Sequence, residues 1–395
     1  MVPKQFMIVA GEPSGDLLAA DLVRALREEL AAREADTSGF SQPLHASLES
    51  RFFGAGGPVM AREGVELLFD MTRHAVVGLS DALKKIVTFR GLMLRLLRGA
   101  VERKPHAIIC VDFSGFNLRL AHAIRSAVAR WRGPFFNWNP KIVQFVSPQV
   151  WASRPGRARQ LARDVDLLLS IFPFEKEWYA QHAPKLQVEF VGHPIVDRYV
   201  DFGKSSADSK HLIVFLPGSR AGELRRHVPA MDEAARLLDG SKVMVLPNAE
   251  LKAMAEGLLS PGSKIQLQIG GLPEALRQAE LAIAATGTVT MECAYFGVPT
   301  IAMYKTSWTT YQIAKRIIKV NHLAMPNLLA GETLFPEFIQ DAATPVNLAR
   351  AAKELLGNPK RRTEIANKLA GVIASLGPPG ASRRAARAIA RLVVT

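Results

Sequence analysis

Short apolar runs alternate with helix-length amphipathic segments along this chain. Such alternation is typical of parallel β-α-β units, in which buried strands are followed by helices that cover the sheet. In the first half, the runs predict strands at residues 6–10, 51–55, 107–112, 142–147, 167–172 and 188–191. A second series predicts strands at residues 211–216, 242–246, 265–269, 281–285 and 300–304, and from Pro345 the pattern is helical to the end.

A polar stretch at residues 201–210 separates the two series and has the composition of an interdomain linker. We therefore predict an α/β protein with two doubly wound, Rossmann-like domains that face a cleft. The predicted domains span residues 1–203 and 204–375, and a helical segment follows at residues 376–395. Residues 35–50 are polar and predict a loose loop. Ligands of doubly wound folds bind at the carboxyl ends of the strands, so candidate site residues are expected there.

The charge and cysteine content narrow the class of partner and the compartment. The 395 residues include 50 Lys and Arg against 36 Asp and Glu, a formal net charge of +14. This excess favours nucleic acid, phospholipid or a phosphorylated substrate as partner, although a generally basic proteome explains it equally well. The two distant cysteines, Cys110 and Cys293, argue against a disulfide framework or a four-ligand zinc site and indicate a reducing cytosol. The sequence shows neither a signal peptide nor an apolar run long enough to span a bilayer.

The motif Gly-Glu-Pro-Ser-Gly-Asp, residues 11–16, follows the first predicted strand and opens a helix. Backbone N–H groups at such a turn can approach a phosphate or a sugar, which makes Glu12, Ser14 and Gly15 candidate cleft residues. A tight turn whose Ser14 or Asp16 caps the helix explains the motif without any ligand.

Asp112 stands at the end of a buried strand. Partial burial there can raise the pKa of its carboxyl group toward use as a general base, although carboxylates in this position often bind loop N–H groups instead. Asn117 begins the next predicted helix, where it can orient a substrate or cap the helix.

In the second half, the turn Pro-Gly-Ser-Arg at residues 217–220 closes the first strand and precedes a helix. A hydroxyl, a guanidinium and a helix N-terminus converge there, which suits a diphosphate bound by Ser219 and Arg220.

A second turn in this half contains Gly287 and Thr288, which offer N–H and hydroxyl donors to a phosphate. Glu292 lies about one helical turn further on, where its carboxylate can accept hydrogen bonds from ribose hydroxyls. The alternative for Glu292 is a first-turn acid favoured by the helix dipole.

Residues 83–104 combine apolar positions at helical spacing with basic side chains. Such a helix can lie in the headgroup layer of an anionic membrane. A surface helix packed on the sheet has the same periodicity, and the sequence alone does not separate the two. The residues expected to face the membrane are Lys84, Lys85, Arg90, Arg95 and Arg98.

The pair Asp164 and Asp166 resembles the metal-binding Asp-x-Asp of some sugar-nucleotide enzymes, but it precedes its strand and so falls at the wrong end of the sheet. No other cluster has the spacing of metal ligands, and we predict neither a metal nor a cofactor.

Taken in order, the motifs resemble those of the lipid-A-disaccharide synthase family, and the likeness extends over roughly residues 6 to 390. They are Gly-Glu-Pro-Ser-Gly-Asp (11–16), Val-Asp-Phe-Ser-Gly-Phe-Asn (111–117), Val-Ser-Pro-Gln-Val-Trp (146–151), Phe-Pro-Phe-Glu (172–175), Phe-Val-Gly-His-Pro (190–194), Leu-Pro-Gly-Ser-Arg (216–220), Ala-Thr-Gly-Thr-Val-Thr-Met-Glu (285–292) and Met-Pro-Asn-Leu-Leu-Ala-Gly (325–331).

The resemblance implies a GT-B glycosyltransferase that moves a diacylated glucosamine from UDP to the 6-hydroxyl of 2,3-diacylglucosamine 1-phosphate, with inversion and without a metal. It implies that Asp112 is the base, that Arg220 and Asn327 belong to the UDP-sugar site, and that Glu292 holds the ribose. It further implies a peripheral protein on the cytoplasmic face of the inner membrane of a Gram-negative-type bacterium. A homodimer with exchanged carboxyl-terminal parts, and a final helix that crosses back to the N-terminal domain, are expected on the same ground.

Two positions depart from the family pattern. Gly115 stands where many relatives carry a second Asp, and Ser153 stands where they carry an aromatic residue. Two alternative functions also remain open at this point. The first is another GT-B protein, such as a sugar-nucleotide 2-epimerase or a transferase for a peptidoglycan lipid. The second is a nucleic-acid binder, which the aromatic content of 7% disfavours.

Overall fold

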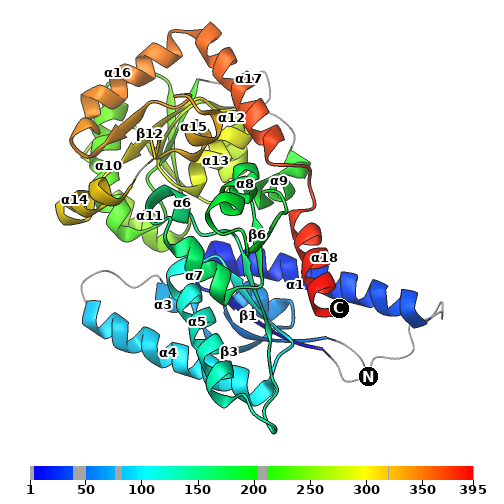
Figure 1. Cartoon of the computed structure of the whole chain (residues 1–395). Helices are drawn as coiled ribbons and strands as arrows, with labels where there is room; N and C mark the ends of the chain where they lie inside the picture. Colours follow the sequence, from blue (N-terminus) through cyan, green and yellow to red (C-terminus); the bar gives the residue numbers. More distant parts are fainter. Residues whose placement is uncertain (1–3, 39–49, 76–81, 203–210, 319, 395) are drawn as a thin grey trace. The chain divides into compact units, whose positions relative to one another are not determined.

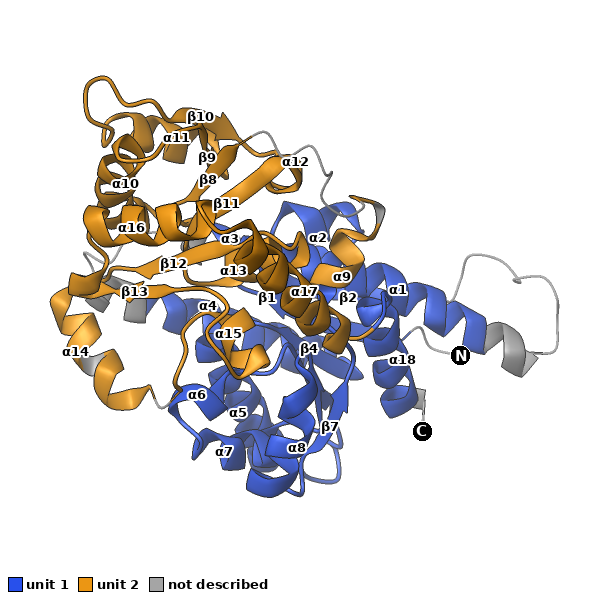
Figure 2. Ribbon diagram, turned by 90° about the horizontal axis from the view of Figure 1, so that it is seen from above, with its two compact units in different colours: residues 1–194, 378–395 blue, residues 195–377 orange. Residues whose placement is uncertain are grey.

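The computed structural model describes residues 4–38, 50–75, 82–202, 211–318 and 320–394 (Figure 1). The chain divides into two compact units, each built on its own parallel sheet (Figure 2). Unit 1 comprises Met1–Pro194 together with Pro378–Thr395, and unit 2 comprises Ile195–Gly377.

Unit 1 contains a seven-stranded sheet in the order β3-β2-β1-β4-β5-β6-β7. Its strands are β1 (Gln5–Ala10), β2 (Arg51–Gly56), β3 (Glu66–Asp70), β4 (Ala107–Val111), β5 (Lys141–Phe145), β6 (Leu167–Ser170) and β7 (Gln187–Phe190). Its helices are α1 (Pro13–Ser38), α2 (Pro58–Arg62), α3 (Thr72–Ala75), α4 (Ala82–Arg103), α5 (Ser114–Trp131), α6 (Val150–Ser153), α7 (Arg157–Asp164), α8 (Pro173–His182) and α18 (Ala381–Val394).

Unit 2 contains a six-stranded sheet in the order β10-β9-β8-β11-β12-β13. Its strands are β8 (Leu212–Leu216), β9 (Ser241–Leu246), β10 (Gln266–Ile269), β11 (Ala279–Ala285), β12 (Thr300–Tyr304) and β13 (Glu337–Ile339). Its helices are α9 (Pro194–Arg198), α10 (Ala221–Arg236), α11 (Ala249–Glu256), α12 (Leu272–Gln278), α13 (Thr288–Tyr295), α14 (Trp308–Ile317), α15 (Met325–Ala330), α16 (Pro345–Leu356) and α17 (Pro359–Ser375). Short 3-10 helices occupy Val200–Phe202 and Gln340–Ala342.

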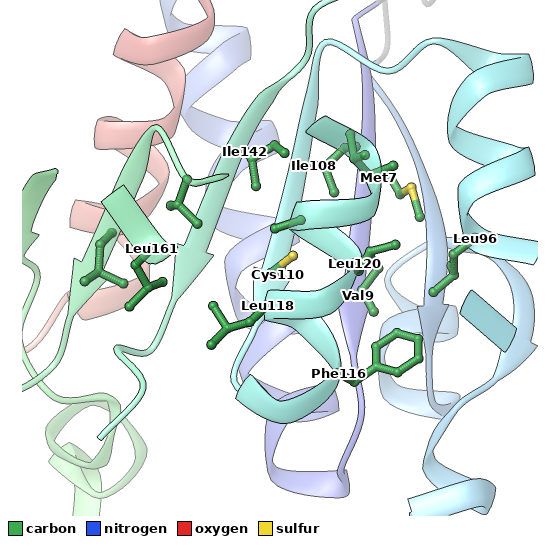
Figure 3. Close-up of a cluster of buried hydrophobic side chains, with 14 of the residues drawn as sticks. Met7, Val9, Leu96, Ile108, Cys110, Phe116, Leu118, Leu120, Ile142 and Leu161 are labelled. Carbon is green, nitrogen blue, oxygen red and sulfur yellow. The ribbon is translucent and has the colours of Figure 1, made fainter. Parts of the chain in front are cut away.

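The central strands of unit 1 are buried on both faces, which is why they read as continuous apolar runs. Figure 3 shows Met7, Ile108 and Cys110 of β1 and β4 packed under Phe116 and the rest of α5. In the register of the sheet, Ile8 of β1 lies opposite Gly54 of β2. Gly54 has a φ of 154°, and a Cβ there would overlap the Ile8 carbonyl, so this pairing of β1 and β2 requires glycine.

The structure differs from the predicted elements at several points. It adds two short edge strands, β3 and β13, and α1 continues to Ser38 through residues predicted as loop. The rest of that loop, residues 39–49, lies outside the described residues, as do residues 203–210 of the predicted linker. Unit 2 begins before the predicted boundary at residue 203, because Tyr199 packs on Tyr295 and Phe296 of unit 2.

Candidate active-site elements

Asp112 occupies a turn of unusual backbone conformation between β4 and α5. Asp112 and Phe113 have φ angles of 49° and 43°, in the left-handed region that Asp and Asn tolerate better than most residues. The amide N–H of Asp112 donates to the carbonyl oxygen of Phe145, at 2.8 Å. The half-buried Asp112 side chain thus stands at the carboxyl edge of the sheet, where the sequence placed the candidate base.

Two buried amide side chains hold this turn. Asn117 Nδ2 donates to the carbonyl oxygens of Asp112, at 2.9 Å, and Val111, at 3.2 Å. Gln144 Nε2 also donates to the Asp112 carbonyl, at 3.2 Å. Asn117 is fully buried, so the structure assigns it to positioning Asp112. Gln144, which the sequence reasoning missed, is a polar residue within an otherwise apolar strand.

The start of α1 lies beside the Asp112 turn. A Cβ built on Gly15 would be 3.9 Å from the Asp112 Cβ and 3.8 Å from the Val111 carbonyl oxygen. Ser14 is exposed and Glu12 half-buried at this same edge. The candidate cleft residues Glu12, Ser14 and Gly15 are therefore brought together with Asp112.

Asp16 corrects one expectation for this motif. Its carboxylate is buried and accepts hydrogen bonds from the backbone N–H groups of Gly57, at 2.7 Å, Val59, at 3.0 Å, and Met60, at 3.2 Å. Asp16 therefore caps α2 rather than its own helix, since three unpaired N–H groups at the start of α2 point toward it.

A second buried cluster lies beyond the ends of β5 and β6. Glu175 accepts hydrogen bonds from Trp151 Nε1, at 3.0 Å, and from the Phe172 N–H, at 3.2 Å. Tyr179 OH donates to the Pro148 carbonyl, at 3.2 Å, and the Ser147 hydroxyl donates to Tyr179 OH, also at 3.2 Å. Burial raises the pKa of Glu175 to about 7.

This cluster joins the motifs at residues 146–151 and 172–175, to which no site role was assigned from sequence. The signal that could have identified the cluster in the sequence was Glu175, an acidic residue in the first helical turn after a buried strand.

Gly115, one of the two positions expected to depart from the family pattern, is exposed in the first turn of α5. A Cβ built there meets nothing within 4 Å. The fold therefore leaves room for the missing carboxylate, and no neighbouring side chain explains its replacement by glycine.

In unit 2, the turn between β8 and α10 already binds a carboxylate of the chain itself. Glu223 Oε2 accepts a hydrogen bond from the Ser219 N–H, at 3.0 Å, and Glu223 Oε1 lies 3.8 Å from Arg220 Nη1. Gly218 has a φ of 115° and packs against the Glu223 side chain. Arg220 itself is largely exposed, with 66% of its side chain accessible. An N–H donor and a guanidinium thus meet one carboxylate here, and the diphosphate site at Ser219 and Arg220 stays a prediction. The sequence did not point to Glu223.

His227 ties this turn to the loop after β12. The ring is fully buried, its Nδ1 lies 2.7 Å from the Pro217 carbonyl oxygen, and the Lys305 N–H donates to its Nε2, at 3.0 Å. A carbonyl on one side and an N–H on the other require the neutral tautomer with the proton on Nδ1. Burial lowers the pKa of His227 and supports this neutral form. A lone histidine nearly two turns into the helix was too weak a signal to identify this role.

The other predicted element of unit 2 is the turn before α13. Gly287 precedes the helix with a φ of 147°, and the Thr290 hydroxyl donates to its carbonyl, at 2.7 Å. Thr288 begins α13 and is exposed.

Glu292 is largely buried within α13. Its Oε1 accepts hydrogen bonds from Tyr199 OH, at 2.8 Å, and from Arg198 Nη1, at 3.3 Å. Burial raises the pKa of Glu292, against the lowering effect of these two partners. Glu292 therefore differs from the solvated first-turn acid that was the alternative, and it has a defined ion-pair partner in α9.

Asn327 lies in α15 of unit 2. It is fully buried, and Oδ1 accepts hydrogen bonds from the N–H groups of Leu334, at 2.9 Å, and Phe335, at 2.8 Å. Nδ2 donates to the Phe335 carbonyl, at 2.7 Å, and to Glu337, at 2.8 Å. All the hydrogen bonds of the amide are made within the fold, and its assignment to the UDP-sugar site stays a prediction. Asn327 instead holds α15 against the segment that leads into β13.

The basic helix α4 is packed on the sheet by its apolar side. Leu92, Leu96 and Ala100 are buried in the core of unit 1, whereas Val87 and Leu94 are 72% and 56% exposed. Among the predicted membrane-facing residues, Arg90 and Arg98 are exposed on the same helix, and the side chains of Lys84 and Lys85 lie outside what the structure describes.

Arg95 is exposed as well, and its side chain also contacts β3. Its Nη2 donates to the Leu68 carbonyl, at 2.8 Å, and its guanidinium lies over the Phe69 ring, at 4.8 Å. Because this side chain is engaged with β3, it stabilises the packing of α4 on the sheet.

Within the described ranges, no helix is long and apolar enough to cross a membrane. In the same part of the chain, no three His, Cys, Asp or Glu side chains are grouped so as to hold a metal ion. Asp164 pairs with Arg163, at 3.0 Å, and Asp166 accepts the Ile142 N–H, at 2.7 Å, so both carboxylates take part in internal contacts.

Comparison with known proteins identifies the family. The sequence model of the family described as Lipid-A-disaccharide synthetase matches residues 6–391. The chain belongs to this family. Curated lipid-A-disaccharide synthases from Trichlorobacter lovleyi and Myxococcus xanthus are 36% and 32% identical to it, and each comparison covers 99% of this chain and 98% of the relative. Among the functions that the sequence left open, this match favours the lipid A enzymes over the other GT-B proteins and over a nucleic-acid binder.

Solved structures support the GT-B fold of the two units. A putative UDP-N-acetylglucosamine 2-epimerase from Listeria monocytogenes is similar at a TM-score of 0.60, with 15% identity and coverage of 100% of this chain and 98% of that one. The glycotransferase of kitacinnamycin is similar at 0.59, with 17% identity and full coverage of both chains. At such low identity, these likenesses concern the fold alone.

Proposed function

We propose that this protein condenses UDP-2,3-diacylglucosamine with 2,3-diacylglucosamine 1-phosphate to give the β-1,6-linked disaccharide 1-phosphate and UDP. The observation that carries the proposal is the near-full-length match to the Lipid-A-disaccharide synthetase family. Two features support it: a carboxylate at the end of β4 and an anion-binding turn at the end of β8.

In the proposed mechanism, Asp112 accepts the proton of the 6-hydroxyl as its oxygen attacks the anomeric carbon. One such displacement inverts the configuration at that carbon. The Ser219 N–H and Arg220 stabilise the negative charge that develops on UDP as the sugar leaves, a task that the donors now facing Glu223 are suited to perform. Glu292, with Gly287 and Thr288, would then bind the nucleoside. No metal takes part in the proposed transfer.

The deciding experiment is product analysis by mass spectrometry. The purified protein is incubated with UDP-2,3-diacylglucosamine and 2,3-diacylglucosamine 1-phosphate, without added metal, and a disaccharide 1-phosphate is expected together with one equivalent of UDP. A parallel incubation with soluble UDP-N-acetylglucosamine alone tests the epimerase alternative. Conversion in the second reaction with no product in the first would overturn the proposal.

We further propose that the protein acts as a peripheral enzyme on the cytoplasmic face of the inner membrane, with α4 in contact with anionic lipid. Val87 and Leu94 project from the exposed side of this helix, flanked by Arg90 and Arg98. Apolar groups beside cations suit the headgroup layer of an anionic membrane. Both substrates of the proposed reaction carry acyl chains, which anchor them in the same membrane. A homodimer is proposed on family likeness, and sedimentation velocity would test it.

A further inference from the structure

A second surface of unit 1 combines exposed aromatic rings with positive charge. The connection from α5 to β5 contains an aromatic turn, defined here as residues 131–138, which extends beyond the end of α5 (Figure 1). It lies at the amino-terminal edge of the sheet, opposite the edge that carries Asp112. None of the proposed catalytic or UDP-binding residues belongs to it.

The aromatic turn is rigid. Gly133 and Phe136 exchange both backbone hydrogen bonds, at 3.1 Å each, and so close a tight two-residue turn around Pro134 and Phe135. The Phe136 ring packs edge to face against Trp131 and Trp138, with centroids 5.9 and 6.2 Å apart.

Hydrogen bonds to neighbouring segments also hold the base of the aromatic turn. Trp138 Nε1 donates to the Pro105 carbonyl, at 2.8 Å. Arg125 Nη1 donates to the carbonyl of Pro140, at 3.2 Å, and Lys104 lies over the Phe136 ring, at 5.2 Å. These contacts tie the base of the turn to α5 and to the segment after α4.

This rigid support presents one aromatic side chain to solvent. Phe135, at the tip, is 99% exposed, and Trp131 beside it is 45% exposed. Such exposure of a large ring is unfavourable in water, and it is maintained here by the turn that supports it.

The chain segment that contains the tip carries charge of one sign. Residues 126–141 contain no Asp or Glu, and Arg130, Arg132 and Lys141 are all exposed. A projecting ring with cations around it matches the interfacial layer of an anionic bilayer, in which rings lie at headgroup depth and Arg or Lys bind lipid phosphates. A narrow convex tip suits this better than a protein partner, because a stable protein interface needs about 800 Å² from each side.

We propose that the aromatic turn inserts Phe135 into the headgroup layer of anionic phospholipid membranes, as an anchor separate from α4. The inference rests on the proposed membrane association and adds a second contact to it. The helix α4 connects the two contacts, since Val87 and Leu94 are exposed along it and Lys104, directly after its last residue, lies over the Phe136 ring of the aromatic turn. Binding of the membrane through both α4 and the aromatic turn would fix the orientation of unit 1 on the bilayer as well as its distance from it.

An environment-sensitive fluorophore on a single cysteine tests this inference. Both native cysteines, Cys110 and Cys293, are buried, so Phe135→Cys, Leu94→Cys and Val346→Cys can each be labelled selectively. Val346, 66% exposed in unit 2, is the matched control. Each labelled protein is mixed with vesicles of phosphatidylglycerol or of phosphatidylcholine, and binding is followed in parallel by co-sedimentation.

We expect the label at position 135 to shift to the blue with phosphatidylglycerol vesicles but not with phosphatidylcholine, while the label at position 346 stays unchanged. Unlabelled Phe135→Ser should bind phosphatidylglycerol vesicles about tenfold or more weakly than Val346→Ser, given the apolar surface of one phenylalanine ring.

If the protein sediments with the vesicles and position 94 responds while position 135 does not, the aromatic turn is no anchor and the membrane proposal stands. If the protein does not sediment at all, the proposed membrane association fails, and this inference with it. A shift at position 135 that depends on protein concentration without vesicles would overturn the inference in favour of a contact between copies of the chain.

Discussion

Asp112 lies in a turn whose backbone is held by two buried amide side chains. The left-handed turn at residues 112 and 113 points the chain away from β4, and Asn117 and Gln144 hold the Asp112 carbonyl. A substitution test must therefore keep this conformation. Asn tolerates the left-handed region, whereas Ala adds backbone strain to the loss of the carboxylate.

We predict that Asp112→Asn lowers kcat by about 10²- to 10⁴-fold, the usual contribution of a general base, and leaves UDP affinity unchanged. Steady-state kinetics and calorimetric titration with UDP measure the two quantities. Asp239→Asn, at an exposed site of unit 2, is the matched control. Full activity in the variant, or loss of UDP binding together with turnover, would remove Asp112 from the role of base.

Glu223 competes with the proposed ligand for the turn before α10. Its carboxylate accepts the Ser219 N–H and lies near Arg220, the two groups proposed to bind the diphosphate. We predict that Glu223→Gln tightens UDP binding by roughly fivefold, because one like-charge repulsion is removed. Glu233→Gln, on the exposed side of the same helix, should leave binding unchanged. Weaker UDP binding in Glu223→Gln would mean that the carboxylate supports the turn instead.

Glu175 couples the stability of unit 1 to pH. Burial raises the pKa of its carboxyl from 4.5 to about 7, so between these pH values the folded protein keeps a proton that the unfolded chain releases. The stabilisation from this group is complete below pH 4.5 and is lost as pH rises toward 7, a change on the order of 3 kcal/mol.

We predict that Glu175→Gln flattens the pH dependence of the melting temperature over this range, as measured by calorimetry between pH 4.5 and 8. Glu177→Gln, exposed on the same helix, should retain the wild-type slope. An unchanged slope in Glu175→Gln would show that Glu175 is ionised in the folded protein.

At the scale of an element, α4 divides its basic residues between two tasks. Arg95 is bound to β3, and Arg103 pairs with Glu66 through both nitrogens, at 2.6 Å each. Arg90 and Arg98 are exposed on this helix, whereas a charge reversal at Arg95 would disturb packing as well as charge. Membrane binding is therefore best tested at Arg90 and Arg98.

We predict that the double variant Arg90→Glu and Arg98→Glu binds phosphatidylglycerol vesicles about tenfold more weakly or worse, since each basic residue near an anionic surface contributes about 1 kcal/mol. The wild-type affinity should fall as salt is raised. Lys353→Glu with Lys360→Glu makes the same change of net charge on exposed sites of unit 2. If both double variants lose the same vesicle affinity, the effect reflects the net charge of the protein, and α4 is not a specific membrane contact.

At the scale of the whole molecule, the chain enters unit 1 twice. After α17 of unit 2 it continues into α18, which packs on α1 and buries Ala385, Ala386 and Ile389 (Figure 2). Arg384 Nε donates to the Val191 carbonyl beyond β7, at 2.7 Å. The last helix is therefore part of the core of unit 1, although it follows unit 2 in sequence.

We predict that removal of residues 378–395 destabilises unit 1 and spares unit 2. Hydrogen exchange measured by mass spectrometry should show faster exchange in α1 and the strands beneath it, with unit 2 peptides unchanged. The substitution Arg383→Ala, at an exposed position of α18, is a control that should leave α1 protected. Faster exchange confined to unit 2 would contradict the assignment of this helix.

The sequence by itself determined the order of strands and helices, the two sheets and the turns that carry Asp112 and Arg220. These follow from hydrophobic periodicity and from turn residues, which are properties of short segments. The edge strands β3 and β13 escaped prediction because a few half-buried residues carry little periodic signal. The family motifs likewise sufficed to identify the family.

Only the tertiary structure decided which partner each polar group takes. Asp16 caps α2, which lies far along the chain, and Glu292 pairs with Arg198 and Tyr199. The side-chain amide of Asn327 makes its hydrogen bonds within the fold. The division of α4 into a core side and an exposed side, and the projection of Phe135, also became visible only in the structure. A buried polar group must find a partner wherever packing brings one, and that partner is set by contacts between distant segments rather than by local sequence.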